Sequence, residues 1–185
     1  MEQNTRILIV EDHPSDAILV KHELDLALTH CITHVVETEP DFIRALKEFK
    51  PDLIISDYLM PGFDGLTALK IATSQTPLTP VIIATGSMNE ETAVICMKAG
   101  ATDYVIKEHL RRLGPAVIHA LEQKKIKAEK IKAEIALKEK EEALRKSEER
   151  YRTIARLSSD FSYSCIHEAD GSYCCLLYTS DAADE

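Results

Sequence analysis

Residues 51–62 read PDLIISDYLMPG, and this stretch decides the fold. Its residues 53–56 are apolar or small, which is typical of a short strand buried on both faces of a parallel sheet. Asp57 follows directly, and residues 60–62 then signal a turn. Open α/β sheets bind ligands beyond the carboxyl ends of their strands, so Asp57 is a candidate functional residue. The simpler alternative is that Asp57 only caps the next helix.

The chain before and after this stretch alternates short apolar runs with helical patterns. The other predicted strands are residues 6–10, 32–37, 80–84 and 103–106, and the predicted helices are 14–26, 42–49, 64–73 and 90–98. Five such alternations in about 120 residues predict a parallel sheet with helices on both faces. Right-handed crossovers favour the strand order 2-1-3-4-5. The predicted class is therefore α/β, a doubly wound, flavodoxin-like five-stranded parallel sheet with a long C-terminal helix.

The first helix has Pro14 at a plausible first position. Its apolar residues alternate with polar ones in an amphipathic pattern. The apolar residues of this pattern are Ala17, Ile18, Leu19, Leu24 and Leu26.

The composition changes from residue 115 onward. Residues 122–150 contain no Gly or Pro and consist mostly of Ala, Glu, Lys, Leu, Ile, Arg and Gln, which predicts one long helix. Seven-residue steps connect Leu121, Ala128 and Ile135, and, offset by two, Leu137, Leu144 and Tyr151. This pattern favours a parallel coiled coil and thus a homodimer through residues 115–150. The alternative is a solvated single helix with Glu–Lys pairs along its surface.

Composition and charge exclude several classes of function. The chain of 185 residues can hold one ordinary domain and an appendage, and its net charge of −9 argues against nucleic-acid binding. It has no apolar run of the ~20 residues that a membrane span needs. The first six residues do not resemble a signal peptide, so we expect a cytoplasmic protein. The five cysteines lack metal-binding spacing, and we assign them no chemistry.

Four of the predicted strands end in polar residues, namely Glu11-Asp12, Asp57, Thr85 and Lys107. The ends of parallel strands lie along one edge of the sheet, so these side chains can converge. Clustered carboxylates repel each other, and Mg²⁺, which prefers oxygen ligands, relieves that repulsion. An ammonium and a hydroxyl can bind the oxygens of a transferred phosphoryl group. The set predicts in-line phosphoryl transfer onto Asp57.

Each of these residues has an ordinary explanation when taken alone, and so does Tyr104 in the predicted strand 103–106. Thr85 is typical of a turn, Lys107 of an exposed surface charge, and Tyr104 of core packing. Only their joint placement at strand ends indicates a functional site.

Residues 5–123 resemble a response-regulator receiver domain of two-component signalling. The resemblance rests on four motifs that occur in the same order as in that family: ILIVED at 7–12, DYLMPGFDG at 57–65, AT at 84–85 and DYVIK at 103–107. It implies that Asp57 accepts a phosphoryl group from the phosphohistidine of a sensor histidine kinase or phosphotransfer protein. The chain is then a signalling domain rather than an enzyme.

The resemblance also implies roles for neighbouring residues. Asp12, Asp57 and the backbone carbonyl of Leu59 would bind Mg²⁺, with Glu11 contributing, and Thr85 with Tyr104 would form a switch pair. On phosphorylation the Thr85 hydroxyl would move to the phosphoryl group and Tyr104 would turn inward. The family commonly has a cis-bonded Pro after its Lys. A cis bond is costly before any other residue, and here the residue is Glu108.

The C-terminal part resembles a second module. Residues 147–154 are similar to the start of a PAS sensory domain, and residues 159–171, which end in Asp170-Gly171, resemble its first hairpin. Residues 175–185, CLLYTSDAADE, resemble the translation of a common transposase sequencing adapter, so we interpret them as a library artefact. The predicted parts are a receiver domain at 1–123, a helical linker at 124–150, a truncated PAS start at 151–174 and the artefact at 175–185.

Two other functions fit some of these features. A phosphatase of the haloacid-dehalogenase type also uses a strand-end Asp with Mg²⁺, but it needs a second Asp two residues later, where this chain has Leu59. A pseudo-receiver that never takes phosphate is the other alternative. This alternative is less favoured because the chain has Asp12, Asp57, Thr85 and Lys107.

Overall fold

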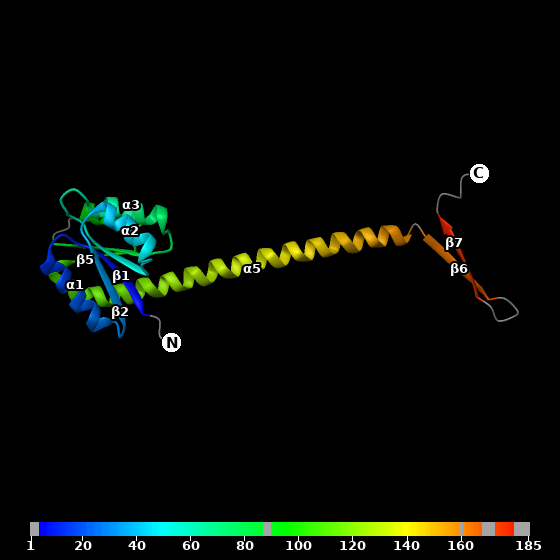
Figure 1. Ribbon diagram of the computed structural model, residues 1–185, viewed down its shortest axis with the longest axis horizontal. Helices are drawn as coiled ribbons and strands as arrows, with labels where there is room; N and C mark the ends of the chain where they lie inside the picture. The colour runs from blue at the N-terminus through cyan, green and yellow to red at the C-terminus, as the bar shows by residue number, and fades with distance from the viewer. Residues whose placement is uncertain (1–3, 87–89, 160, 168–172, 180–185) are drawn as a thin grey trace. The chain divides into compact units, whose positions relative to one another are not determined.

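The structure, a computed structural model, describes residues 4–86, 90–159, 161–167 and 173–179 (Figure 1). The chain divides into two units, Met1–Lys130 and Ile131–Glu185. Each is described by itself below.

The first unit contains a five-stranded parallel sheet. Its strands are β1 (Thr5–Val10), β2 (Cys31–Val36), β3 (Leu53–Asp57), β4 (Val81–Thr85) and β5 (Asp103–Ile106), and their order is β2-β1-β3-β4-β5. Every residue of β3 and β4 is buried, because these central strands are covered on both faces. The predicted fold class and strand order are confirmed.

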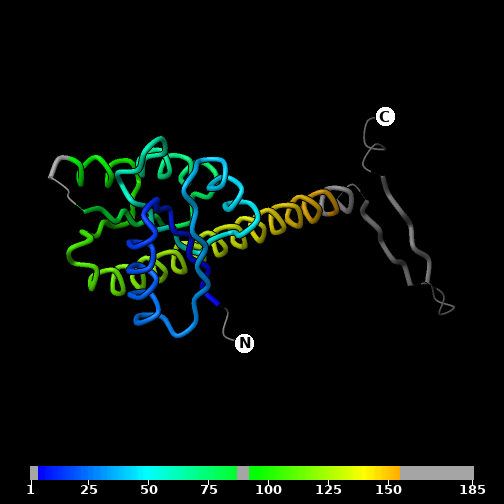
Figure 2. Tube along the Cα trace, turned by 60° about the vertical axis from the view of Figure 1, so that its left-hand side comes forward, coloured from blue at the N-terminus to red at the C-terminus, as the bar shows by residue number. Residues whose placement is uncertain are grey.

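Helices cover both faces of this sheet (Figures 1 and 2). The elements are α1 (Pro14–Ala27), α2 (Glu39–Glu48), α3 (Gly65–Gln75), α4 (Glu90–Lys98), the 3₁₀ helix η1 (Lys107–Arg112) and α5 (Leu113–Ser159). On one face, Val20 and Leu24 of α1 and Val117 of α5 pack against Ile9 and Ile55. On the other, α2, α3 and α4 contribute Phe42, Leu69 and Cys96 to a second core. Alternate side chains of each central strand enter one core or the other.

The turn after β3 directs the chain from the strand into α3. Gly62 has a φ of 78°, a left-handed conformation that favours glycine, and it lies in the predicted turn. Asp64 then caps α3, since its Oδ1 accepts a hydrogen bond of 2.7 Å from the backbone N–H of Thr67. This cap fixes where α3 begins relative to the end of β3.

The buried side of α1 contains only some of the apolar residues of its amphipathic pattern. Ala17, Val20 and Leu24 are buried, in steps of three and four residues that place them on one side of the helix. Ile18, Leu19 and Leu26 are 64%, 51% and 71% exposed instead. Apolar side chains therefore occur on both sides of α1, and the amphipathic pattern in the sequence did not separate the buried side from the exposed one.

α5 is longer than the sequence pattern indicated. It runs to Ser159, beyond the expected end at residue 150. Residues 151–157 contain neither Gly nor Pro, so nothing in them stops a helix. Ile135, Leu137, Leu144 and Tyr151 are each more than half exposed. The coiled coil therefore stays a prediction.

The second unit contains two strands besides the end of α5. β6 (Phe161–His167) pairs antiparallel with β7 (Tyr173–Thr179). The expected Asp170-Gly171 turn lies outside the described residues. β7 extends across residue 174, where we expected the PAS fragment to end, and the predicted domain bounds stay predictions. Among the described helices, none is both long and apolar enough to span a bilayer.

An ion pair attaches the start of α5 to the sheet at the end opposite to Asp57. The Lys124 ammonium lies 2.9 Å from the carbonyl oxygen of Asp52 and 3.1 Å from its Oδ1. The other carboxylate oxygen, Oδ2, accepts a 3.1 Å hydrogen bond from the N–H of Arg6. Burial raises the pKa of Asp52, but the bonds from Arg6 and Lys124 outweigh burial and lower the pKa below its ordinary value.

This pKa shift predicts a pH-dependent contribution to stability. The folded pKa of Asp52 lies below its unfolded value, so the stabilisation is complete above the unfolded pKa and is lost as pH falls through the folded one. We expect Asp52→Asn to lower the free energy of unfolding by about 1 kcal/mol at pH 7, with the difference shrinking below about pH 4. Urea unfolding across this range measures it. Asp41→Asn, which alters an exposed pair with Arg44, is the control. The prediction would be contradicted if wild type and Asp52→Asn differed as much in free energy of unfolding at pH 2.5 as at pH 7.

Candidate functional site

The carboxyl ends of the parallel strands bring the predicted site residues to one edge of the sheet. The register pairs Val10 with Ser56, Asp57 with Ala84 and Thr85 with Ile106. Glu11 follows β1 and Lys107 follows β5 directly, so both reach the same edge as Asp57. The sequence-based placement of these strand ends agrees with the structure.

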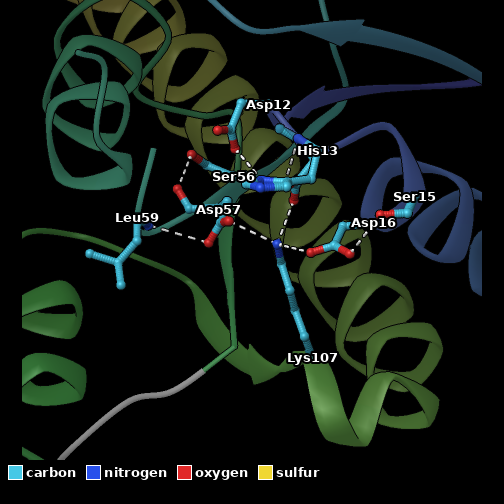
Figure 3. A network of polar contacts seen from close by, with 9 residues as sticks. Asp12, His13, Ser15, Asp16, Ser56, Asp57, Leu59 and Lys107 are labelled. Carbon is cyan, nitrogen blue, oxygen red and sulfur yellow. Dashed lines mark hydrogen bonds and ion pairs between the residues drawn. The ribbon is translucent and has the colours of Figure 1, made fainter. Parts of the chain in front are cut away.

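Lys107 lies at the centre of the site (Figure 3). Its Nζ is 2.8 Å from Oδ2 of Asp57, 2.8 Å from Oε2 of Glu11 and 2.6 Å from Oδ2 of Asp16. The exposed fraction of the side chain is 14% for Lys107, 8% for Asp57 and 2% for Glu11. A single ammonium, with three N–H groups, is therefore shared by three carboxylates, of which those of Glu11 and Asp57 are buried and that of Asp16 is 33% exposed.

The pKa values of this cluster reflect burial opposed by ion pairing. Burial alone would lower the pKa of Lys107, but bonds to Asp16, Asp57 and Glu11 outweigh burial and raise it far above the usual value. Burial raises the pKa of Glu11, and the nearby Asp57 carboxylate adds to the rise, while Lys107 opposes it. The pKa of Asp16 is lowered, mainly by its bond from Lys107. Lys107 therefore keeps its charge at neutral pH, whereas burial and the neighbouring Asp57 disfavour the charged form of Glu11.

The local backbone fixes the carboxylate of Asp57. Its Oδ1 accepts a 3.3 Å hydrogen bond from the N–H of Leu59, and the Ser56 hydroxyl donates to its carbonyl oxygen at 3.0 Å. Gly65, the first residue of α3, donates its N–H to the carbonyl of Tyr58 at 3.1 Å. One carboxylate oxygen of Asp57 therefore faces Lys107 and the other faces the loop that follows β3.

Asp12 and His13 form the outer part of the cluster. Nδ1 of His13 is 2.9 Å from Oδ1 of Asp12 and 3.8 Å from Oε1 of Glu11. Asp12 raises the pKa of His13 through a hydrogen bond and its charge. Glu11, Asp12 and His13 each offer a ligand atom, and these atoms lie within 4.8 Å of one another. A hard divalent cation fits this set, because several carboxylates here face few positive charges.

Thr85 and Tyr104 lie on the same side of the sheet. Tyr104 is paired with Ile83 in the register and packs against the core formed with α2, α3 and α4, where Ile83 also lies. Side chains alternate along a strand, so Thr85, two residues after Ile83, points to that same side. Thr85 is completely buried at the end of β4. The two predicted switch residues are therefore diagonal neighbours on adjacent strands.

Asp16 was absent from the sequence-based list of site residues. It lies in the first turn of α1, where an acidic residue is common for reasons of helix stability alone. Its contact with Lys107 joins residues 91 positions apart, and no local pattern indicates such a contact. His13 directly precedes α1, and its side chain makes no hydrogen bond that caps the helix.

The loop that carries Lys107 has no cis bond among its described residues. Lys107 and Glu108 instead begin the 3₁₀ helix η1. The peptide bond between Lys107 and Glu108 is trans, as expected before a residue other than proline. Lys107 is still held by three carboxylates.

A comparison with known families identifies the domain. Residues 7–118 match the family described as the response regulator receiver domain. The chain belongs to this family. Receiver domains are signalling domains of two-component systems, where they interact with histidine kinases or phosphotransfer proteins. They generally bind Mg²⁺ at an acidic pocket, and this receiver has its acidic cluster in Glu11, Asp12 and His13.

Two related proteins each match about two thirds of the chain or slightly less. The DNA-binding transcriptional regulator NtrC of Proteus hauseri is 34% identical over 129 residues, 66% of this chain and 26% of that protein. The two-component response regulator ORR1 of Oryza sativa subsp. indica is 31% identical over 129 residues, 60% of this chain and 56% of that protein. The receiver chain thus spans less than two thirds of the length of these relatives.

Solved structures have the same fold. A response regulator receiver domain protein from Clostridium thermocellum matches with a TM-score of 0.60 and 26% identity, over 66% of this chain and 98% of that one. NtrX from Brucella abortus matches with a TM-score of 0.61 and 29% identity, over 69% of this chain and 29% of that one.

Proposed function

We propose that this receiver accepts a phosphoryl group on Asp57 from the phosphohistidine of a histidine kinase or phosphotransfer protein. The observation that carries the proposal is the 2.8 Å contact between the Lys107 ammonium and Oδ2 of Asp57, inside a buried acidic cluster at the strand ends. A carboxylate held in this way is oriented and next to a fixed positive charge. Those are the properties that a phosphoryl acceptor needs.

The transfer is a substitution at phosphorus. A carboxylate oxygen of Asp57 forms the new P–O bond while the P–N bond to the donor imidazole breaks, and the bonding electron pair remains on that nitrogen. Lys107 stabilises the negative charge on the phosphoryl oxygens as it develops. The buried surroundings strengthen this interaction, because few waters screen it.

Glu11, Asp12, Asp57 and the backbone carbonyl of Leu59 are the residues that we propose to hold Mg²⁺. When bound, the ion neutralises phosphoryl charge that one ammonium cannot neutralise alone. The donor set supports this assignment, since oxygen ligands are those that Mg²⁺ prefers and the carboxylate of Glu11 is buried close to that of Asp57.

We further propose that Thr85 and Tyr104 report the phosphoryl group to the rest of the chain. Their position as diagonal neighbours on β4 and β5 supports a coupled movement. α5 follows η1 without a break and is the route to residues 151–174, which we propose to be the start of a PAS module. The exposed apolar residues of α5 support pairing with a second copy, and a cytoplasmic location fits a kinase-coupled switch.

One measurement tests the acceptor. The protein is incubated with acetyl phosphate, with Mg²⁺ or with EDTA, and its intact mass is recorded. The expected result is the gain of one phosphoryl group only with Mg²⁺, and borohydride reduction should then convert residue 57 to homoserine. Steady hydrolysis of added phosphate esters would indicate a phosphatase instead. No gain of mass under either condition would indicate a pseudo-receiver.

A further inference from the structure

Asp16 contacts the ammonium of Lys107 from the side of α1. Its Oδ2 is 2.6 Å from Nζ, and its Oδ1 accepts a 3.4 Å hydrogen bond from the hydroxyl of Ser15. Asp16 is the third residue of α1, and its own N–H donates to the carbonyl of His13 at 3.1 Å. Figure 3 shows Asp16 and Asp57 on opposite sides of the Lys107 ammonium.

We propose that Asp16 is a positioning residue that holds the Lys107 ammonium beside Asp57 throughout phosphoryl transfer. This inference rests on the function proposed above. Of the three carboxylates around the ammonium, Glu11 and Asp57 belong to the proposed cation and phosphoryl sites. Their oxygens must rearrange when a phosphoryl group arrives. Asp16 lies outside those sites and is the one anchor that need not change.

The anchor also fixes the direction in which Lys107 points. A lysine side chain has four rotatable bonds and loses considerable rotamer freedom when held in one place. Asp16 is on α1 and Asp57 is on β3, so the ammonium is held from two elements at once. A phosphoryl group on Asp57 would then meet a cation that is already in place, without a reorganisation step.

The ordinary alternative is that Asp16 only stabilises the start of α1. A carboxylate in the first turn interacts favourably with the helix dipole wherever its side chain points. That role predicts a small loss of stability on neutralisation and no dependence on Lys107. The two roles are therefore separable by experiment.

The test compares Asp16→Asn with Asp25→Asn, the same substitution at an exposed position of the same helix. With saturating Mg²⁺ and acetyl phosphate, we expect Asp16→Asn to slow phosphorylation about tenfold and Asp25→Asn to leave it unchanged. Asp16→Glu, which restores the charge, should recover most of the rate. In a Lys107→Gln background, Asp16→Asn should cause no further loss, because the partner of Asp16 is gone.

A second readout needs neither metal nor turnover. In the metal-free wild type, the Lys107 ammonium protons should give a resolved ¹⁵N–¹H signal, because three carboxylates protect them from exchange with water. Asp16→Asn should lose that signal and Asp25→Asn should keep it.

The outcomes separate this inference from the function on which it rests. A wild type that gains no phosphoryl group overturns both. If the wild type is phosphorylated, two results overturn only the role of Asp16. One is a phosphorylation rate of Asp16→Asn within twofold of that of Asp25→Asn. The other is that Asp16→Asn slows phosphorylation by the same factor in the Lys107→Gln background as in the wild type.

Discussion

Asp57→Asn should leave a folded protein that gains no phosphoryl group from acetyl phosphate. An amide oxygen is a far weaker nucleophile than a carboxylate oxygen, so the proposed acceptor is removed outright. The size and shape of the side chain stay the same. The amide oxygen can accept only one of the two bonds that the carboxylate accepts, which are 3.3 Å from the N–H of Leu59 to Oδ1 and 2.8 Å from Lys107 to Oδ2.

Stability is expected to change little in this variant. Lys107 loses one charged partner, which is unfavourable, but Glu11 loses a like-charged neighbour, which is favourable. These effects oppose each other, and we expect a net change within about 1 kcal/mol. The pKa of Glu11 should fall toward its ordinary value, because the Asp57 carboxylate contributes to its rise. Carbon-13 NMR of the Glu11 carboxyl measures that change.

Asp52→Asn is the matched control for phosphorylation. It is the same chemical substitution at the opposite end of β3, and it should be phosphorylated at the wild-type rate. A phosphoryl group gained by Asp57→Asn itself would contradict the assignment and would mean that another residue, such as an exposed histidine, is the acceptor.

The strands and their edge residues were predictable because their signals are local. Fully apolar runs such as residues 53–56 occur where a strand is covered on both faces, and the polar residue after each run marks its carboxyl end. Parallel pairing then converts four separate sequence positions into one site. The buried side of α1 was less predictable, since Ile18 and Leu19 are apolar and yet face solvent.

Asp16 could not have been found in this way. Its partner Lys107 is 91 residues distant, and an acidic residue in a first helical turn has a sufficient local explanation. Only the positions of α1 and η1 in the folded sheet bring the two charges together. The same limit applies to Gly65, whose importance depends on a close approach between α3 and the end of β3.

Gly65→Ala should destabilise the receiver and disturb the phosphoryl acceptor together. A Cβ atom at this position would lie 2.3 Å from the carbonyl oxygen of Asp57 and 2.9 Å from Cα of Tyr58. Both are backbone atoms next to the functional side chain, so neither can rotate away. Either α3 moves outward or the end of β3 shifts.

The expected loss is about 3 kcal/mol of unfolding free energy, at the upper end of what overpacking usually costs. Phosphorylation by acetyl phosphate should slow by more than about tenfold, because a shift of the acceptor of even 1 Å disturbs in-line attack. Gly86→Ala is the matched control, since a Cβ there would meet nothing within 4 Å. Urea unfolding and intact-mass kinetics measure both effects. If Gly65→Ala matched Gly86→Ala in stability and rate, the close packing of α3 on the phosphoryl-acceptor strand would not be what positions Asp57.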